Sequence, residues 1–119
     1  MAADPIQSRL DAIREQLAPP WTENEERVVE IGTIPILVQK RGHWYHLKDG
    51  GEAVARARAL GAPSDWLTIA ERVVDEDALN VNRSGVVFVS AVEGRDVASL
   101  VLCVADCAER VQAAMLDAA

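Results

Sequence analysis

Two cysteines and two histidines make four possible zinc ligands in this sequence, which makes them the first candidates for chemistry. Cys103 and Cys107 are four residues apart, so on a helix their thiols would be one turn apart and within reach of one zinc ion. His43 and His46 are three residues apart in a segment typical of a β-strand, where side chains alternate between two faces, so the two rings should point in opposite directions. We therefore expect no metal ion and no other cofactor, and we expect Cys107 to pack in the core with Cys103 at its margin.

Other patterns typical of catalysis are incomplete. Neither histidine has a nucleophile or an orienting carboxylate at a spacing known from catalytic triads, and neither Ser90 nor Ser99 lies in a G-x-S-x-G turn. Residues 75–80 begin like a calcium-binding loop, but Leu79 and Asn80 stand where an oxygen ligand and a glycine are required. We predict no catalytic residues and a protein that is not an enzyme.

Residues 41–46, Arg-Gly-His-Trp-Tyr-His, contain both histidines, the single tyrosine and one of the three tryptophans. As a strand, this segment would place His43 and Tyr45 on one face and Trp44 and His46 on the other. Tyr45 shares its face with Leu47, so that face should meet the core and leave Trp44 exposed. Aromatic and arginine side chains commonly anchor protein interfaces. The candidate partner-binding residues are therefore Lys40, Arg41, His43 and Trp44, and the alternative is a purely structural strand.

The charge distribution bears on the kind of partner. The chain carries a net charge of −7, which opposes binding to nucleic acid, because that affinity comes mostly from Lys and Arg neutralising phosphates. Only residues 33–63, with five bases and two acids, are net positive. No apolar run approaches the ~20 residues of a membrane span, and the first residues do not resemble a secretion signal. We expect a cytoplasmic protein with no nucleic-acid or membrane partner.

The periodicity of apolar residues predicts one α+β domain over residues 1–119. Its elements follow the order helix, three strands, two helices, strand, helix. The helices should pack on one face of a mainly antiparallel sheet of about four strands. Expected helices are 5–17, beginning at an Asp4 cap, 52–60, a segment starting at Ser64 or Asp65, and 95–117; expected strands are 27–32, 33–40, 43–48 and 85–92. Pro35 indicates that 33–40 is an edge strand or contains a bulge.

The last of these helices has two apolar stripes where a helix on a sheet needs only one. The main stripe contains Val97, Leu100, Val101, Val104, Ala108, Val111 and Met115. The second contains Ala98, Leu102, Ala105, Ala113 and Leu116. Burial on two sides would come either from neighbouring helices or from a second copy across a two-fold axis. In the second case the protein is a homodimer, and Leu102, Ala105 and Leu116 form its interface.

Two segments resemble known sequences. The run SRLDAIREQLAPPWT, residues 8–22, resembles the opening of small uncharacterised proteins of actinobacterial phages, and FVSAVEGRDVASLVLCVADCAERV, residues 88–111, is similar to their usual ending. The likeness covers about a third of the chain. These proteins share no established activity or site residues, so the resemblance implies only a small accessory protein that acts by binding.

Together these observations favour a non-enzymatic protein that binds another protein, such as a phage-encoded modulator of a host factor. The first alternative is a virion component, such as a head or tail connector, in which an oligomeric ring would bury the second stripe. A further alternative is a small-ligand protein or enzyme with a pocket formed by His46, Trp44 and Arg56 or Arg58.

The acidic charge leads to a first prediction. At about 150 mM salt, random duplex or single-stranded nucleic acid should bind with a dissociation constant above about 1 µM, because few phosphates can be neutralised. Fluorescence anisotropy with labelled oligonucleotides measures this directly. Sub-micromolar binding that weakens steeply with added salt would contradict the expectation.

Overall fold

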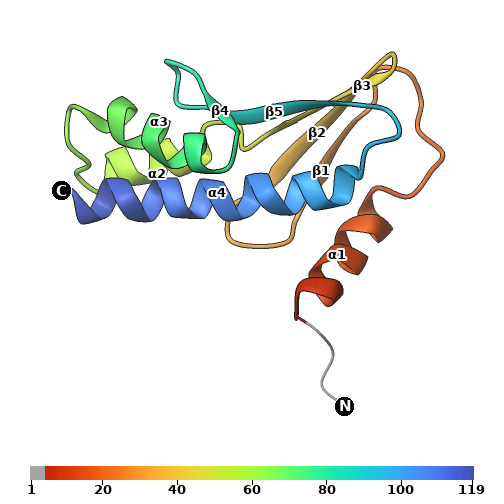
Figure 1. Ribbon diagram of the computed structural model, residues 1–119, viewed down its shortest axis with the longest axis horizontal. Helices are drawn as coiled ribbons and strands as arrows, with labels where there is room; N and C mark the ends of the chain where they lie inside the picture. Colours follow the sequence, from red (N-terminus) through yellow and green to blue (C-terminus); the bar gives the residue numbers. More distant parts are fainter. Residues whose placement is uncertain (1–4) are drawn as a thin grey trace.

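Helices cover one face of an antiparallel sheet in this computed structural model, which describes residues 5–119 (Figure 1). The described residues form four helices and five strands, so the predicted α+β class is confirmed with one strand more than expected. The helices are α1 (Pro5–Gln16), α2 (Glu52–Ala59), α3 (Trp66–Glu76) and α4 (Val97–Asp117). The strands are β1 (Glu26–Val29), β2 (Ile36–Arg41), β3 (Trp44–Lys48), β4 (Asn80–Val81) and β5 (Val87–Val92).

The strands lie in the order β1-β2-β3-β5-β4, and every neighbouring pair is antiparallel. The predicted meander of the first three strands is confirmed. Gly42 and His43 alone connect β2 to β3, and Gly42 has a φ of 58°, a conformation that suits glycine at the start of a two-residue hairpin turn. His43 therefore lies in the turn and not in the strand, which corrects the prediction that it shares a face with Tyr45.

Two further details of the sheet differ from expectation. Pro35 precedes β2, and β2 is an inner strand between β1 and β3, so the prediction of an edge strand or a bulge there was wrong. The polar segment expected after α3 contains β4, which pairs Asn80 with Phe88 and Val81 with Val87. Two residues are too short for an alternating pattern to reveal a strand.

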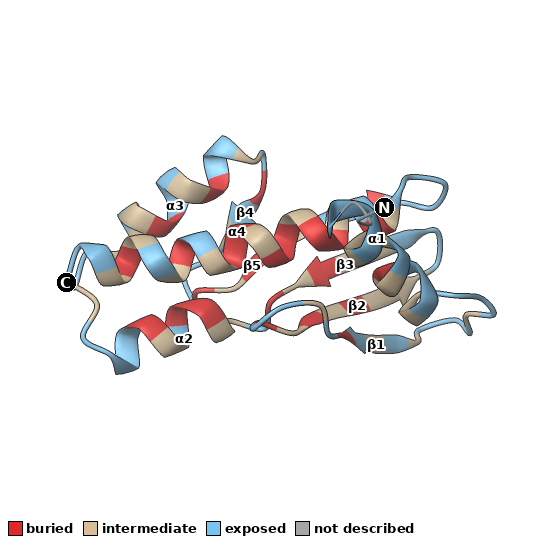
Figure 2. Ribbon diagram, turned by 90° about the horizontal axis from the view of Figure 1, so that it is seen from below, coloured by how far each residue is buried: buried red, intermediate tan, exposed pale blue. Residues whose placement is uncertain are grey.

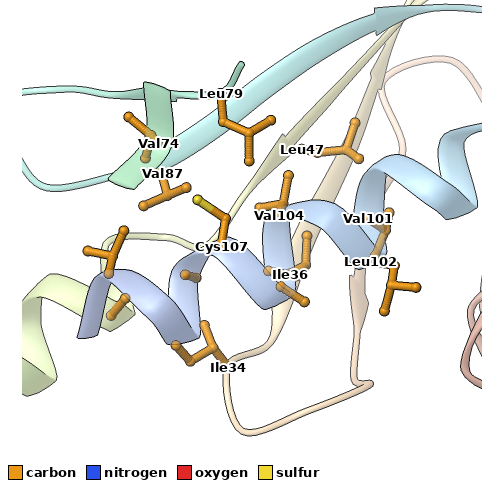
Figure 3. Packing of buried hydrophobic residues seen from close by; sticks show 14 of the residues in the cluster. Ile34, Ile36, Leu47, Val74, Leu79, Val87, Val101, Leu102, Val104 and Cys107 are labelled. Atoms are coloured by element: carbon orange, nitrogen blue, oxygen red, sulfur yellow. The ribbon is translucent and has the colours of Figure 1, made fainter. Parts of the chain in front are cut away.

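The core lies between the sheet and α4, which packs against β2, β3 and β5 and carries many of the buried residues (Figure 2). Sheet residues Ile36, Leu47 and Val87 and helix residues Val104 and Cys107 are all fully buried in it (Figure 3). Burying each large aliphatic side chain stabilises the fold by about 1.5–3 kcal/mol. Among the described residues, no helix has the length and apolar character needed to cross a membrane.

Part of the second stripe of α4 is buried within one chain, because α4 packs against α1, α2 and α3 as well as the sheet, whereas Ala113 of that stripe is exposed. Leu102 and Ala105, two of the candidate interface residues, are 9% and 1% exposed within one chain. They have little area left to offer a second copy. Leu116 is half-buried.

Local hydrogen bonds determine where α4 begins and where α3 ends. The Asp96 carboxylate accepts hydrogen bonds from the backbone N–H and the hydroxyl of Ser99, which caps the start of α4. At the end of α3, Leu79 N–H donates to the Val74 carbonyl across a residue in the left-handed conformation, Ala78, with a φ of 56°. This is the turn that glycine usually makes. It directs the chain from α3 into β4.

Asp49 is the single charged residue classed as buried among residues 5–119, at 3% exposure. Its carboxylate accepts hydrogen bonds from the backbone N–H groups of Gly51 at 2.8 Å, Val87 at 2.9 Å and Ala53 at 3.2 Å. Burial raises the pKa of this carboxyl above its usual value, and the three backbone donors oppose the rise. The side chain thus joins the end of β3, the start of α2 and the start of β5.

Replacing this carboxylate tests how much the junction depends on it. Asp49→Asn keeps one acceptor oxygen but places an NH₂ group against a backbone donor, so it should lower the free energy of unfolding by about 2 kcal/mol. Urea denaturation of both proteins measures the difference. The matched control is Asp65→Asn, which removes an exposed carboxylate without a capping hydrogen bond and should change stability by less than about 0.5 kcal/mol. Equal stability of Asp49→Asn and the wild type would mean that charge burial cancels the three hydrogen bonds.

Candidate functional site

The face of the sheet opposite the helices is uncovered, and none of its side chains is fully buried. The alternation of side chains along each strand, together with the register of the strand pairs, shows which residues lie on this face. These residues form rows that run across neighbouring strands. We call this surface the open face. It comprises Glu26, Val28, Leu37, Gln39, Arg41, Trp44, His46, Lys48, Phe88, Ser90 and Val92.

One row of the open face, next to the hairpin turn, consists of Arg41, Trp44 and Val92. Trp44 is 48% exposed and Val92 is 44% exposed, although both belong to inner positions of the sheet order. Arg41 forms an ion pair with Glu26 at 3.0 Å, which holds its guanidinium over the face. An exposed tryptophan beside an arginine and an aliphatic side chain is the composition of a protein-interface anchor.

The middle row contains a histidine–serine pair. His46 Nδ1 lies 2.7 Å from Ser90 Oγ, and both side chains line a shallow groove of about 460 Å³. No acidic side chain within residues 5–119 forms a hydrogen bond with His46, so the pair lacks the group that orients the base in a catalytic triad. Other groove residues are Gln39, Arg41, Lys48 and Phe88.

The four predicted partner-binding residues gather at one end of the sheet but not on one face. Arg41 and Trp44 lie on the open face. Lys40 lies on the helix side, where its ammonium is 5.7 Å from the centre of the Tyr45 ring and donates to the Gly42 carbonyl at 2.7 Å. His43 extends from the turn, with its Nδ1 3.0 Å from a carboxylate oxygen of Glu93. The hydrogen bond from His43, followed by the charge of Lys40, lowers the pKa of the Glu93 carboxyl.

The predicted division of the neighbouring aromatic residues is confirmed. Tyr45 turns toward the helices and packs edge-on against Trp21, with ring centres 5.6 Å apart, while Trp44 points away from them. Burial raises the pKa of the Tyr45 hydroxyl. The Trp21 ring in turn lies 3.9 Å from the guanidinium of Arg27, which donates to the carbonyls of residues 16, 18 and 20. Tyr45 is thus part of a structural cluster and not of the site.

Sequence reasoning missed the contribution of β5 to the open face. The candidate binding residues all came from residues 40–44, whereas Phe88, Ser90 and Val92 of β5 also line the open face. The pairing of β3 with β5 joins residues 40 to 48 positions apart, and no local pattern encodes it. The one available signal was Ser90, a polar residue at an alternating position in an otherwise apolar strand.

The residues proposed for a ligand pocket are not brought together. His46 and Trp44 lie on the open face, whereas Arg56 pairs with Glu52 and donates to the Thr33 carbonyl. The guanidinium of Arg58 lies 5.3 Å from the centre of the Trp66 ring, on the helical side.

The two cysteines occupy the positions expected of them. Cys107 is fully buried, and Cys103 is half-buried at the margin of the core. Burial raises the pKa of the Cys107 thiol to about 12 and also raises the pKa of Cys103. Within residues 5–119, no group of three or more His, Cys, Asp or Glu side chains is placed to hold a metal ion.

Comparisons of this chain with protein-family models, with curated proteins and with solved structures return no match. The relation to actinobacterial phage proteins remains a prediction from the sequence. Function must therefore be argued from the geometry of the surface.

The burial of the cysteines predicts their reactivity. At pH 8 a pKa of about 12 leaves roughly one Cys107 in ten thousand as the nucleophilic thiolate, so iodoacetamide should label Cys103 slowly and Cys107 hardly at all. Labelling should become complete at both positions in guanidinium chloride, and peptide mass spectrometry resolves the two sites. Equal labelling rates in the native protein would show that Cys107 is not enclosed by the core.

Proposed function

We infer that this protein is a small non-enzymatic accessory protein that binds another protein on the open face of its sheet. The observation that carries the proposal is the row of Arg41, Trp44 and Val92, where two large apolar side chains stay about half exposed beside a fixed guanidinium. A sheet face left uncovered normally carries polar side chains. This face instead mixes apolar anchors with groups that can form hydrogen bonds.

The charge of the open face supports a protein partner with an acidic surface. Arg41 and Lys48 lie on this face against one acid, Glu26, although the chain as a whole is strongly negative. An acidic partner would be repelled by most of the molecule and attracted to this face. Complementary charge of this kind sets the orientation and rate of association more than the final affinity.

The size of the face limits the interface. Five strands spaced ~4.8 Å apart and at most six residues long give a footprint of at most roughly 20 Å by 20 Å, which is no more than about half of the ~800 Å² that each partner buries in a standard complex. A partner of the open face is therefore expected to extend onto the hairpin turn, where His43 and Glu93 are exposed. This arrangement would use three of the four predicted binding residues.

The decisive test compares two truncations of exposed apolar side chains. Trp44→Ala should weaken capture of partner proteins from a host lysate at least about tenfold, because a tryptophan anchor contributes 2 kcal/mol or more to binding. Leu60→Ala is the control, since Leu60 is 67% exposed at the end of α2, on the other side of the fold. Both variants should keep the melting temperature within a few degrees.

Two outcomes would contradict the proposal. Loss of ~3 kcal/mol of stability in Trp44→Ala would mean that the ring is structural, as is the case for core aromatics. Equal loss of capture in Leu60→Ala would mean that the binding depends on general hydrophobicity and not on the open face.

A further inference from the structure

β5 is paired along its whole length on one side but only at its beginning on the other. β3 pairs with all residues from Phe88 to Val92, whereas β4 pairs with Val87 and Phe88 alone. The chain enters β4 directly from the tight turn at Ala78, so no strand lies beside the second half of β5. β5 therefore has a free edge from Val89 to Val92.

The hydrogen-bond pattern shows which backbone groups this edge presents. Asp49 N–H donates to the Val87 carbonyl and Glu93 N–H donates to the His43 carbonyl, which fixes the alternation of the β3–β5 ladder. In this register Val89 and Ala91 exchange hydrogen bonds with β3, and the N–H and C=O groups of Ser90 and the N–H of Val92 point away from it. The Val92 carbonyl accepts from Arg95 N–H at 3.2 Å. Three strand hydrogen-bonding groups thus face outward without a protein partner among the described residues.

A groove of about 340 Å³ runs beside these groups. Its floor is formed by Leu100 and Cys103 of α4, which are both partly exposed apolar side chains of the core margin. Its far wall is the segment 77–79, the turn that leads into β4. Trp44 and Arg95 lie at the end nearest the hairpin. The groove continues the line of β4 along the edge of β5.

We propose that this groove binds an extended segment of another protein, which adds to the sheet as a strand beside β5. The inference rests on the proposed function in taking the ligand to be a protein, but it names the edge of β5 and a defined ligand. This edge shares Trp44, Ser90 and Val92 with the open face. Ser90 N–H and C=O and Val92 N–H would complete a ladder with the added backbone. Alternate side chains of the segment would lie on Leu100 and Cys103, so every second residue should be apolar.

Charge and shape argue for this occupant over a second copy. No acidic side chain within residues 5–119 forms an ion pair with Arg95, so an acidic residue in the bound segment would find a free cation at the end of the groove. A second copy that paired through β5 would bring its own residues 77–79 to the same edge, whereas an isolated extended segment brings no such wall.

The test uses peptides as the probe. Random linear peptides of about ten residues, displayed and selected on the wild-type protein, should converge on alternating apolar residues with an acidic residue near one end. The affinity of the selected peptide is then measured for two variants at position 90. Ser90→Pro removes the outward N–H without removing a bond to β3, and proline is tolerated where a strand edge faces solvent. Ser90→Ala is the matched control, because it loses the hydroxyl bond to His46 but keeps the N–H.

Ser90→Pro should lower the affinity for the peptide at least about tenfold, and Ser90→Ala should change this affinity less than about twofold. Amide hydrogen exchange on the wild type gives a readout that does not depend on either variant folding. The N–H groups of Ser90 and Val92 should exchange rapidly in the free protein and become protected when the peptide binds.

The outcomes separate this inference from the open-face proposal. Failure to select any peptide, self-association as the sole occupant of the edge, or binding without protection of Ser90 and Val92 would each overturn strand addition. The ligand would lie on the open face instead if Trp44→Ala abolishes peptide binding, Ser90→Pro leaves it unchanged and the peptide does not protect these amides. Protection together with loss in Ser90→Pro supports strand addition whether or not Trp44 anchors a second partner.

Discussion

The junction at Asp49 determines how the two halves of the chain meet. Its carboxylate accepts hydrogen bonds from backbone N–H groups at the start of α2 and at Val87. A single buried side chain thus positions β5 beside β3 across nearly forty residues of sequence. Burying a carboxylate is unfavourable unless its oxygens are satisfied, and here backbone N–H groups satisfy both. The hydrogen bonds are directional, so they fix the register of the strands as well as their proximity.

That register decides which residues share the open face. Because Trp44 stands opposite Val92 and His46 opposite Ser90, residues from two distant segments form continuous rows. A shift of one residue would turn every side chain of β5 to the other face and would bury Ser90 against α4. The same register places Leu47 and Val87 under α4, so the core and the candidate site depend on one alignment.

Local patterns in the sequence predicted the four helices, four of the five strands and the meander of the first three strands, but not the pairing of β5 with β3. The helices expected at 5–17, 52–60 and 95–117 and the inward turn of Tyr45 with Leu47 follow from short-range physical preferences. The pairing of β3 with β5 and the role of Asp49 depend on contacts between distant residues, which a single sequence does not display. β4 was not predicted, because a strand of two residues shows no periodicity. The free edge of β5 exists because β4 is so short.

Outward backbone groups at the two sides of the sheet are satisfied to different degrees. Just past the end of the edge strand β1, the side-chain amide of Gln16 donates to the Glu30 carbonyl at 3.0 Å and accepts from Glu30 N–H at 2.9 Å, so it satisfies both backbone groups of that residue. Proteins commonly block strand edges in such ways, because an exposed edge pairs with other chains. At β5 no side chain of the described residues takes this role for Ser90, although Asp77 and Arg95 lie along the same groove. Asp77 is instead paired with Arg110 of α4, which holds it away from the edge amides. A strand edge that is open above an apolar floor is the arrangement that accepts an added strand.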